Sequence, residues 1–289
     1  MENKLKTMIL KLYLTRGIGN LGIQRLVAQD VDLAALSAEE ISMQAGVVKK
    51  AEFITSWKET NTRFPDEKIA EFTANNDYIT IVDEEYPEAL RETYAPPSVL
   101  FYRGEIALLQ QPLLAVVGSR HPRAESVDLL QMFLPDLFIH ELVIASGLAS
   151  GIDGLAHEMC LENEVPTIAV MGTGLDQCYP KQHESLKRRI EEKGLVLSEY
   201  LPAVGPKRHH FPLRNRIIAG IARGTLIVEA KKRSGSLITA QIALENGREV
   251  FVFPGSPLYE AYLGSLQLIQ DGAKCVFKPQ HIIEEINAY

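Results

Sequence analysis

From Leu113 onward, short apolar segments alternate with longer segments of helical periodicity, and this alternation restricts the fold more than any other feature. The apolar segments are almost uniformly hydrophobic, as strands covered on both faces should be. We expect these strands at 113–117, 142–146, 167–171, 196–199, 225–229, 249–253 and 274–277. Helices are expected at 124–138, 153–163, 181–193, 213–223, 236–246 and 280–288. This order predicts an α/β fold with a doubly wound, mostly parallel sheet.

The chain is expected to have three parts. Residues 1–75 show apolar residues at helical spacing and predict a small helical domain, SAM-like or helix-hairpin-helix-like. Gly17-Ile18-Gly19 interrupts this spacing, and such a turn either offers backbone N–H groups to a DNA phosphate or is an ordinary tight turn. Residues 76–112 are expected to connect, with short strands at 78–82 and 99–102, and residues 113–289 are expected to form the sheet domain.

Five glycine- and serine-rich turns follow the expected strands, at 117–120, 146–153, 172–176, 234–236 and 254–256. Their backbone N–H groups, and the positive ends of the helices that begin after them, favour phosphate binding. Ligands of such sheets bind outside the carboxyl ends of the strands. None of the turns is a GxGxxG fingerprint, which disfavours a dinucleotide. The candidate binding residues in these turns are Gly118, Ser119, Arg120, Ser146, Gly147, Ser150, Gly151, Ser234, Gly235 and Ser236.

Charge is distributed unevenly along the chain. The net charge of −7 at first argues against a polyanionic partner, but residues 179–233 contain 13 Lys and Arg against 5 Asp and Glu. This segment either forms a basic patch on an acidic body or covers solvated helix faces. Lys207-Arg208-His209-His210 mixes cations with ring side chains, a combination that suits a nucleic-acid single strand.

Arg214-Asn215-Arg216 stands at the start of an expected helix, where basic side chains oppose the helix dipole. Two explanations remain open: a bound polyanion, or a buried ion pair, for example with Glu229. Asp153 either caps the helix that follows its turn, which we favour, or is a polar residue of the site, and we expect it to hydrogen-bond His157 one turn later. The surrounding residues do not form a GxSxG nucleophile elbow, so we do not expect this pair to be catalytic.

Composition excludes several classes of protein. Cys160, Cys178 and Cys275 are too few and too widely spaced for a disulfide framework or a zinc site, which agrees with a reducing cytoplasm. No apolar run approaches roughly 18 residues, so no membrane span is expected. No secretory signal is expected either, because no continuous apolar stretch follows Met1-Glu2-Asn3-Lys4. No cofactor is expected.

A series of longer motifs runs through the sheet domain in one order. It comprises Val-Val-Gly-Ser-Arg at 116–120, Ser-Gly-Leu-Ala-Ser-Gly-Ile-Asp-Gly at 146–154, Gly-Thr-Gly-Leu-Asp-x-x-Tyr-Pro-Lys at 172–181, Phe-Pro-x-Arg-Asn-Arg-Ile-Ile-Ala-Gly at 211–220 and Ser-Gly-Ser-Leu-Ile-Thr-Ala at 234–240. This series resembles the DprA/Smf DNA-processing family. The resemblance implies an extended Rossmann-like fold, binding of single-stranded DNA, and a homodimer that delivers the RecA recombinase onto that strand during natural transformation. It implies neither ATP hydrolysis nor nuclease activity.

The resemblance also assigns roles to residues. Carried over by position, the family's basic groove falls on Arg120, Lys181 and the Lys207-Arg208 pair, with Arg208 favoured. Its dimer and RecA contacts fall within 236–289, where we select Leu266, Ile269 and Ile283. The alternative is that these apolar residues only cover the final strand. The sequence departs from the family pattern at Gly264-Ser265-Leu266. Many family members carry an asparagine in this stretch, and this chain does not.

A second function from a different class is a nucleotide-processing enzyme of the phosphoribohydrolase type, which has a related fold. Those enzymes carry a Pro-Gly-Gly-x-Gly-Thr loop, and Pro254-Gly255-Ser256-Pro257 lacks it. We therefore expect a DNA-binding protein without enzymatic activity.

Overall fold

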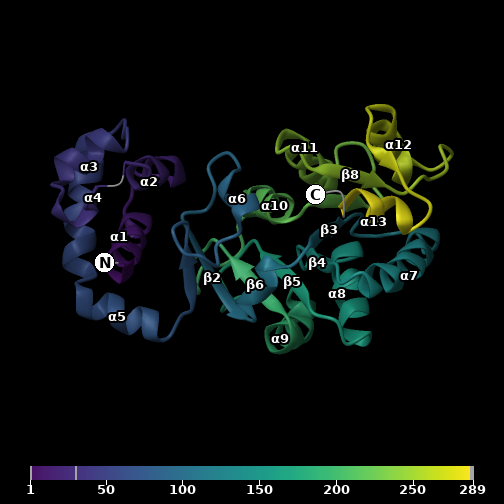
Figure 1. The fold of residues 1–289 in the computed structure, drawn as a ribbon, viewed down its shortest axis with the longest axis horizontal. Coiled ribbons are helices and arrows are strands. Elements are labelled where there is room, and N and C mark those ends of the chain that lie inside the picture. Colours follow the sequence, from purple (N-terminus) through teal and green to yellow (C-terminus); the bar gives the residue numbers. More distant parts are fainter. Residues whose placement is uncertain (1, 30, 287–289) are drawn as a thin grey trace. The chain divides into compact units, whose positions relative to one another are not determined.

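The computed structural model describes residues 2–29 and 31–286 and divides the chain into two compact units, Met1–Phe101 and Tyr102–Tyr289 (Figure 1). The first unit contains the expected helical segment 1–75 together with much of the expected connecting segment. The second unit contains the expected sheet domain. No helix of the described residues combines the length and the apolar character that are needed to cross a membrane.

The first unit is mostly helical. Gly17 makes the turn between the first two helices with a φ of 90°, and a Cβ there would lie 3.4 Å from the Cβ of Phe53. Its two strands pair antiparallel, with Tyr78 opposite Phe101. The elements are α1 Glu2–Leu14, α2 Asn20–Val27, η1 Leu33–Ala35, α3 Ala38–Gln44, α4 Lys50–Arg63, α5 Asp66–Ala74, β1 Tyr78–Thr80, α6 Glu88–Arg91 and β2 Val99–Gly104, the last of which continues into the second unit.

Strands and helices alternate through the second unit, as the sequence predicts. The elements are η2 Ile106–Gln110, β3 Leu113–Val117, α7 Ala124–Ile139, β4 Val143–Ser146, α8 Ile152–Glu162, β5 Thr167–Met171, η3 Lys181–His183, α9 Glu184–Lys193, β6 Leu195–Ser198, α10 His210–Ile221, β7 Gly224–Ile227, α11 Gly235–Glu245, β8 Glu249–Val252, η4 Glu260–Tyr262, α12 Leu263–Gln270, β9 Lys274–Cys275 and α13 Gln280–Ile286.

The order of the strands across this sheet is β6-β5-β4-β3-β7-β8-β9, and each neighbouring pair is parallel. From β3 the chain builds outward through β4, β5 and β6, and it then returns to place β7 on the other side of β3. Ala115 in β3 lies opposite both Ala145 and Thr225. The expected doubly wound, mostly parallel α/β sheet is therefore confirmed. The reversal between β3 and β7 leaves a crevice at their carboxyl ends, where ligands of such sheets bind.

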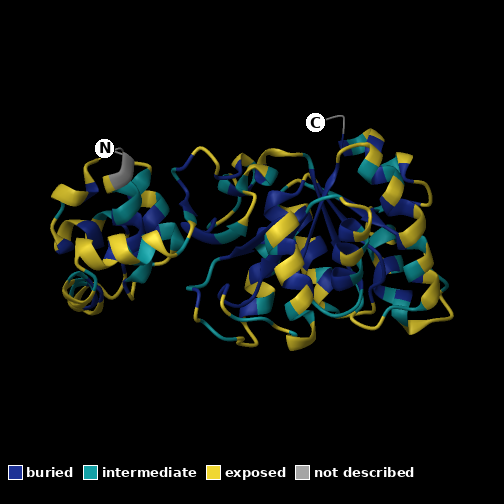
Figure 2. Ribbon diagram, turned by 90° about the horizontal axis from the view of Figure 1, so that it is seen from below, coloured by how far each residue is buried: buried dark blue, intermediate teal, exposed yellow. Residues whose placement is uncertain are grey.

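Helices cover both faces of the sheet. Apolar side chains of α7, α8 and α13 form one core with alternate residues of β3, β4, β7 and β8. Helices α10 and α11 pack against each other and against strands of the sheet, on the opposite face (Figure 1). In Figure 2 the strands are dark blue, whereas exposed residues lie on the outer sides of the helices. Because strands covered on both faces need apolar residues throughout, the uniform hydrophobicity seen in the sequence has its explanation here.

One expected interface residue belongs to this core. Ile283 is 7% exposed and packs among the side chains of the core on α13. The structure therefore contradicts its assignment to a dimer or RecA interface, because its surface is already covered within its own chain. Leu266 and Ile269 lie on α12 and are partly exposed.

Helix α10 begins at His210, three residues before the start expected from the sequence. Pro212 lies within the first turn of this helix, where proline is tolerated because the backbone N–H needs no intrahelical partner. Arg214 and Arg216 consequently do not stand at the N-terminus of the helix, as we had expected. They lie in its second turn, where other contacts decide their role.

Candidate functional site

A groove of about 960 Å³ opens at the carboxyl ends of β3 and β7, in the crevice that the strand order creates. Most of its lining comes from three segments: the turn at 117–121 after β3, residues 206–215 at the start of α10, and residues 229–239 between β7 and α11. We call it the strand-end groove. The position agrees with the sequence-based expectation of a site at the glycine-rich turns.

Most of the residues selected from the sequence line this groove. They are Gly118, Ser119, Arg120, Lys207, Arg208, Arg214, Asn215, Ser234, Gly235 and Ser236. The other selected residues, all in the described part of the chain, do not line it: Ser146, Gly147, Ser150, Gly151, Lys181 and Arg216. Lys181 is exposed two positions after Tyr179, which does line the groove.

Three of the selected residues outside the lining, Ser146, Ser150 and Gly151, have structural roles in the turns. Ser146 is buried, and its hydroxyl donates to the carbonyl of Val116 at 2.6 Å. The hydroxyl of Ser150 accepts from the side chain of Gln182 at 3.3 Å. Gly151 precedes α8 with a φ of 78°, a conformation that favours glycine. These residues shape the groove rather than line it.

Asp153 organises the turn between β4 and α8. Its buried carboxylate accepts the backbone N–H groups of Gly147 and Ala149. The residue lies inside the first turn of α8, whose N-cap is Gly151, so the prediction that Asp153 caps this helix is wrong. Burial raises the pKa of Asp153, and the nearby positive charge of Arg214 acts in the opposite direction.

Arg214 is the buried counterpart of Asp153 in the floor of the groove. Its guanidinium donates to the carbonyls of Gly147 and Val170, and it is 5% exposed. Burial lowers the pKa of Arg214, and the Asp153 carboxylate opposes this effect. Through these two hydrogen bonds Arg214 joins the turn after β4 to the end of β5. Because its guanidinium already donates to backbone carbonyls, Arg214 is not a free phosphate ligand.

Arg216 has a separate partner. Its guanidinium pairs with the carboxylate of Glu199. The ion pair with Glu229 suggested by the sequence is wrong, because that buried carboxylate accepts from the backbone of Arg123 at 2.9 Å and from the hydroxyl of Ser126 at 2.7 Å. Glu229 lines the groove and at the same time holds the start of α7.

His157 does not bond Asp153, so that prediction is also wrong. Its Nδ1 lies 2.8 Å from the hydroxyl of Thr167, and the side chain is fully buried. Burial lowers the pKa of His157 from its ordinary value of 6.5 to about 3. His210 is buried as well: it stacks on Tyr200 with ring centroids 3.9 Å apart, and burial lowers its pKa.

Five cationic side chains line the strand-end groove and are exposed: Arg120, Lys207, Arg208, Lys231 and Arg233. Within the described part of the chain, none of the five has an ion-pair partner. Lys231 and Arg233 are not among the residues predicted from the sequence to form the site. The signal was present in the run Lys231-Lys232-Arg233, which directly precedes a selected turn but was counted only as charge.

Two aromatic rings were also missed. Tyr179 and Phe211 both line the groove, with ring centroids 5.3 Å apart and an angle of 49° between the ring planes. Tyr179 is 49% exposed, so one ring is open to a ligand. Exposed cations beside open rings can hold phosphates and stack bases. Among the described residues, no group of three His, Cys, Asp or Glu side chains has the placement that a metal site needs.

Comparison with known proteins agrees with this geometry. The chain is 49% identical over 206 residues to the DNA processing protein DprA of Streptococcus pneumoniae, a match that covers 71% of this chain and 73% of that protein. It is 40% identical over 210 residues to the DNA processing protein DprA of Bacillus subtilis, covering 72% and 70%.

Solved structures show the same relationship. An X-ray structure of DprA from S. pneumoniae has a TM-score of 0.88 and 41% identity and covers 96% of each chain. A Helicobacter pylori structure, described as giving insight into the single-stranded DNA binding mode of DNA processing protein A, has a TM-score of 0.65 and 31% identity and covers 73% of this chain and 95% of that one. The sequence model described as DNA recombination-mediator protein A matches residues 77–287, which include the whole strand-end groove. The resemblance to DprA/Smf proteins is confirmed, and the chain belongs to the DNA recombination-mediator protein A family.

Proposed function

We propose that this chain binds single-stranded DNA in the strand-end groove. The observation that carries the proposal is the set of five exposed, unpaired cations around a groove that also presents the rings of Tyr179 and Phe211. The cations suit the phosphates, and the rings suit bases whose faces are uncovered. In a duplex the bases stack on one another, so the rings would have no base to contact.

The similarity to the H. pylori protein supports this proposal, because that structure is described by its single-stranded DNA binding mode. The salt dependence of binding should therefore be steep, since each neutralised phosphate releases counterions. Because the rest of the chain is acidic, DNA should be attracted only at the groove. Binding there is compatible with the net charge of −7 of the whole chain.

We further propose that the bound strand is passed to a RecA recombinase and that the chain acts as a homodimer. The description of the family as recombination mediators supports this step. Stacking and phosphate contacts leave the Watson–Crick edges of the bases unused. A strand held in this way stays available for pairing and for transfer to another protein.

The groove is proposed to bind without catalysis. Its two buried carboxylates have structural tasks, since Asp153 holds the turn after β4 and Glu229 holds the start of α7. If the chain were instead a nucleotide-processing enzyme, the purified chain would turn over nucleoside monophosphates. Turnover that disappears in Glu229→Gln would favour the enzyme and contradict the proposal.

The decisive experiment compares two triple variants that remove equal charge. Arg120→Ala/Lys181→Ala/Arg208→Ala removes three cations in or beside the groove, and we expect weaker single-stranded DNA binding with a log-affinity against log-salt slope smaller by about 0.7 per lost contact. Arg188→Ala/Arg189→Ala/Lys193→Ala removes three cations from α9, outside the lining. This control should bind single-stranded DNA with nearly the same slope of log affinity against log salt as the wild-type chain. Equal losses in both variants would contradict a specific groove.

A further inference from the structure

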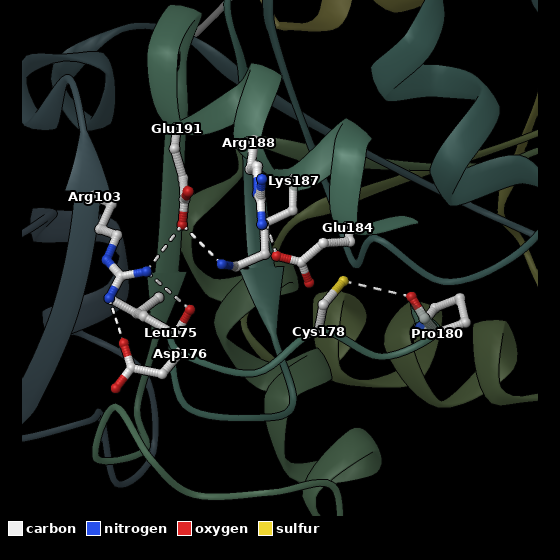
Figure 3. A network of polar contacts seen from close by, with 9 residues as sticks. All are labelled: Arg103, Leu175, Asp176, Cys178, Pro180, Glu184, Lys187, Arg188 and Glu191. Atoms are coloured by element: carbon white, nitrogen blue, oxygen red, sulfur yellow. Dashed lines mark hydrogen bonds and ion pairs between the residues drawn. The ribbon is translucent and has the colours of Figure 1, made fainter. Parts of the chain in front are cut away.

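The segment 174–181 brings Tyr179 into the groove lining and ends at Lys181 beside it, and a cluster of charged side chains lies against this segment (Figure 3). The cluster consists of Arg103, Asp176, Lys187 and Glu191, and we call it the Arg103 network. We propose that Arg103 is a positioning residue: through this network it holds the segment in place and thereby sets the affinity of the strand-end groove for single-stranded DNA. The inference rests on the proposed function.

Arg103 reaches the segment from the end of β2. One of its terminal nitrogens donates to the backbone carbonyl of Leu175 at 3.1 Å, and the other pairs with the carboxylate of Asp176. Figure 3 shows the guanidinium pointing from its strand toward both residues. A planar guanidinium with several donors can engage a carbonyl and a carboxylate together, which a lysine cannot do in the same geometry.

Arg103 is in turn held by α9. The Glu191 carboxylate lies 3.4 Å from the guanidinium of Arg103 and 2.9 Å from the ammonium of Lys187. The Lys187 side chain is only 4% exposed, and it forms an ion pair with Glu191 one helical turn away. The buried Lys187 ammonium thus holds the Glu191 carboxylate beside the guanidinium of Arg103.

The segment has a second set of anchors on its other side. The backbone N–H of Gly174 donates to the carbonyl of Val204 at 2.8 Å, and that of Asp176 donates to the carbonyl of Pro202 at 2.9 Å. Asp176 is therefore held through its backbone by the loop between β6 and α10, which leads to Lys207, and through its side chain by Arg103. From there the chain runs to Tyr179, whose ring packs beside Phe211 in the groove lining.

The charges of the network do not by themselves attract DNA. Two cations, Arg103 and Lys187, are balanced by the two carboxylates of Asp176 and Glu191. Arg103 is absent from the groove lining. An effect of Arg103 on DNA affinity must then come mainly from the position of the residues that it holds. A direct electrostatic attraction of Arg103 for DNA would be small.

The first test asks whether substitutions in the Arg103 network weaken or strengthen the binding of single-stranded DNA. Arg103→Ala is expected to weaken single-stranded DNA binding by about tenfold, the size of one lost base stack. Asp176→Asn removes a negative charge near the groove, so simple electrostatics predicts tighter binding, whereas loss of the anchor predicts weaker binding. Arg188→Ala is the matched control, because Arg188 is 70% exposed and pairs with Glu184 instead of the segment. Asp176→Asn that binds as tightly as wild type, or more tightly, would overturn the proposal.

A double-mutant cycle supplies a readout that general destabilisation would not move. In a Tyr179→Ala/Lys181→Ala background, Arg103→Ala should have little further effect, because the residues that it positions are gone. In a Lys231→Ala/Arg233→Ala background, which alters a different wall of the groove, its effect should remain about tenfold. An equal loss in both backgrounds would show that Arg103 acts generally, against the proposal.

Cys178 gives a readout that does not need DNA. Its thiol lies in the segment and donates to the carbonyl of Pro180 at 3.4 Å, and burial raises its pKa to about 11. In a Cys275→Ser background, maleimide labelling of Cys178 should be faster by on the order of tenfold in Arg103→Ala, because a released segment opens more often, and unchanged in Arg188→Ala. If the wild-type chain bound no single-stranded DNA, the proposed function would fail, while unchanged labelling in Arg103→Ala would separately defeat the positioning role.

Discussion

At the scale of single residues, His157 shows how a buried imidazole makes stability depend on pH. The Thr167 hydroxyl donates to the carbonyl of Ile144, so it accepts from Nδ1 of His157, which must carry the proton. Nε2 is then a bare acceptor, and within the described residues it is buried without a hydrogen-bond partner. A second proton on this ring would have no acceptor, which is why burial lowers its pKa from 6.5 to about 3.

This shift predicts a loss of stability in mild acid. Above pH 6.5 the ring is neutral in the folded and the unfolded chain; between 6.5 and about 3 only the unfolded chain binds the proton, so stability falls as the pH falls. The free energy of unfolding should drop by up to about 1.4 kcal/mol per pH unit from this group. Urea denaturation followed by circular dichroism at several pH values measures it. His157→Asn, which cannot titrate, should be less stable at neutral pH but show a flatter profile, and an identical profile would rule out His157 as the cause.

At the scale of elements, the sequence predicts what depends on local pattern and misses what depends on distant partners. Strands β3 and β5 have the expected bounds because uninterrupted apolar runs end at a glycine-rich turn or a polar residue. The turns that line the groove were found for the same reason. The guanidinium of Arg214, in contrast, bonds the carbonyls of Gly147 and Val170. Those partners lie in other turns, and only the folded sheet brings them within reach.

The contact between two of these turns leads to a prediction about Gly151. A Cβ at this position would lie 2.3 Å from the carbonyl oxygen of Ser119, and the residue has a φ of 78°. Gly151→Ala should therefore push the Gly118–Arg120 turn away from α8 and destabilise the fold by about 1 to 3 kcal/mol. The displaced Arg120 should also weaken single-stranded DNA binding. Thermal unfolding and fluorescence anisotropy measure the two effects.

Gly235 provides the control within the same groove. A Cβ there meets nothing within 4 Å, so Gly235→Ala should change the stability by less than about 0.5 kcal/mol. Similar unfolding temperatures for the two alanine variants would mean that the close approach at Gly151 is not what fixes the turns.

At the scale of the whole molecule, we propose that α12 is the surface through which the chain pairs with a second copy. Its start is held to the segment that follows β7, because the N–H groups of Gly264 and Ser265 donate to the carbonyl of Ala230 at 2.9 and 3.0 Å. Leu266 and Ile269, one turn apart, remain partly exposed. Partly exposed apolar side chains on a firmly held helix suit an interface, and a two-fold pair is the commonest arrangement.

We therefore expect Leu266→Glu/Ile269→Glu to give a folded monomer. Two grooves joined in one dimer engage a long strand with greater avidity, so this monomer should bind long single-stranded DNA more weakly but a short oligonucleotide as well as wild type does. Sedimentation equilibrium and anisotropy with both lengths measure this. Gln267→Glu adds charge to an exposed position of the same helix and should leave the assembly intact. Ile283→Glu should instead unfold the chain, because Ile283 lies in its own core. The prediction would be wrong if the wild-type chain sedimented as a monomer. It would also be wrong if Leu266→Glu/Ile269→Glu still formed a dimer.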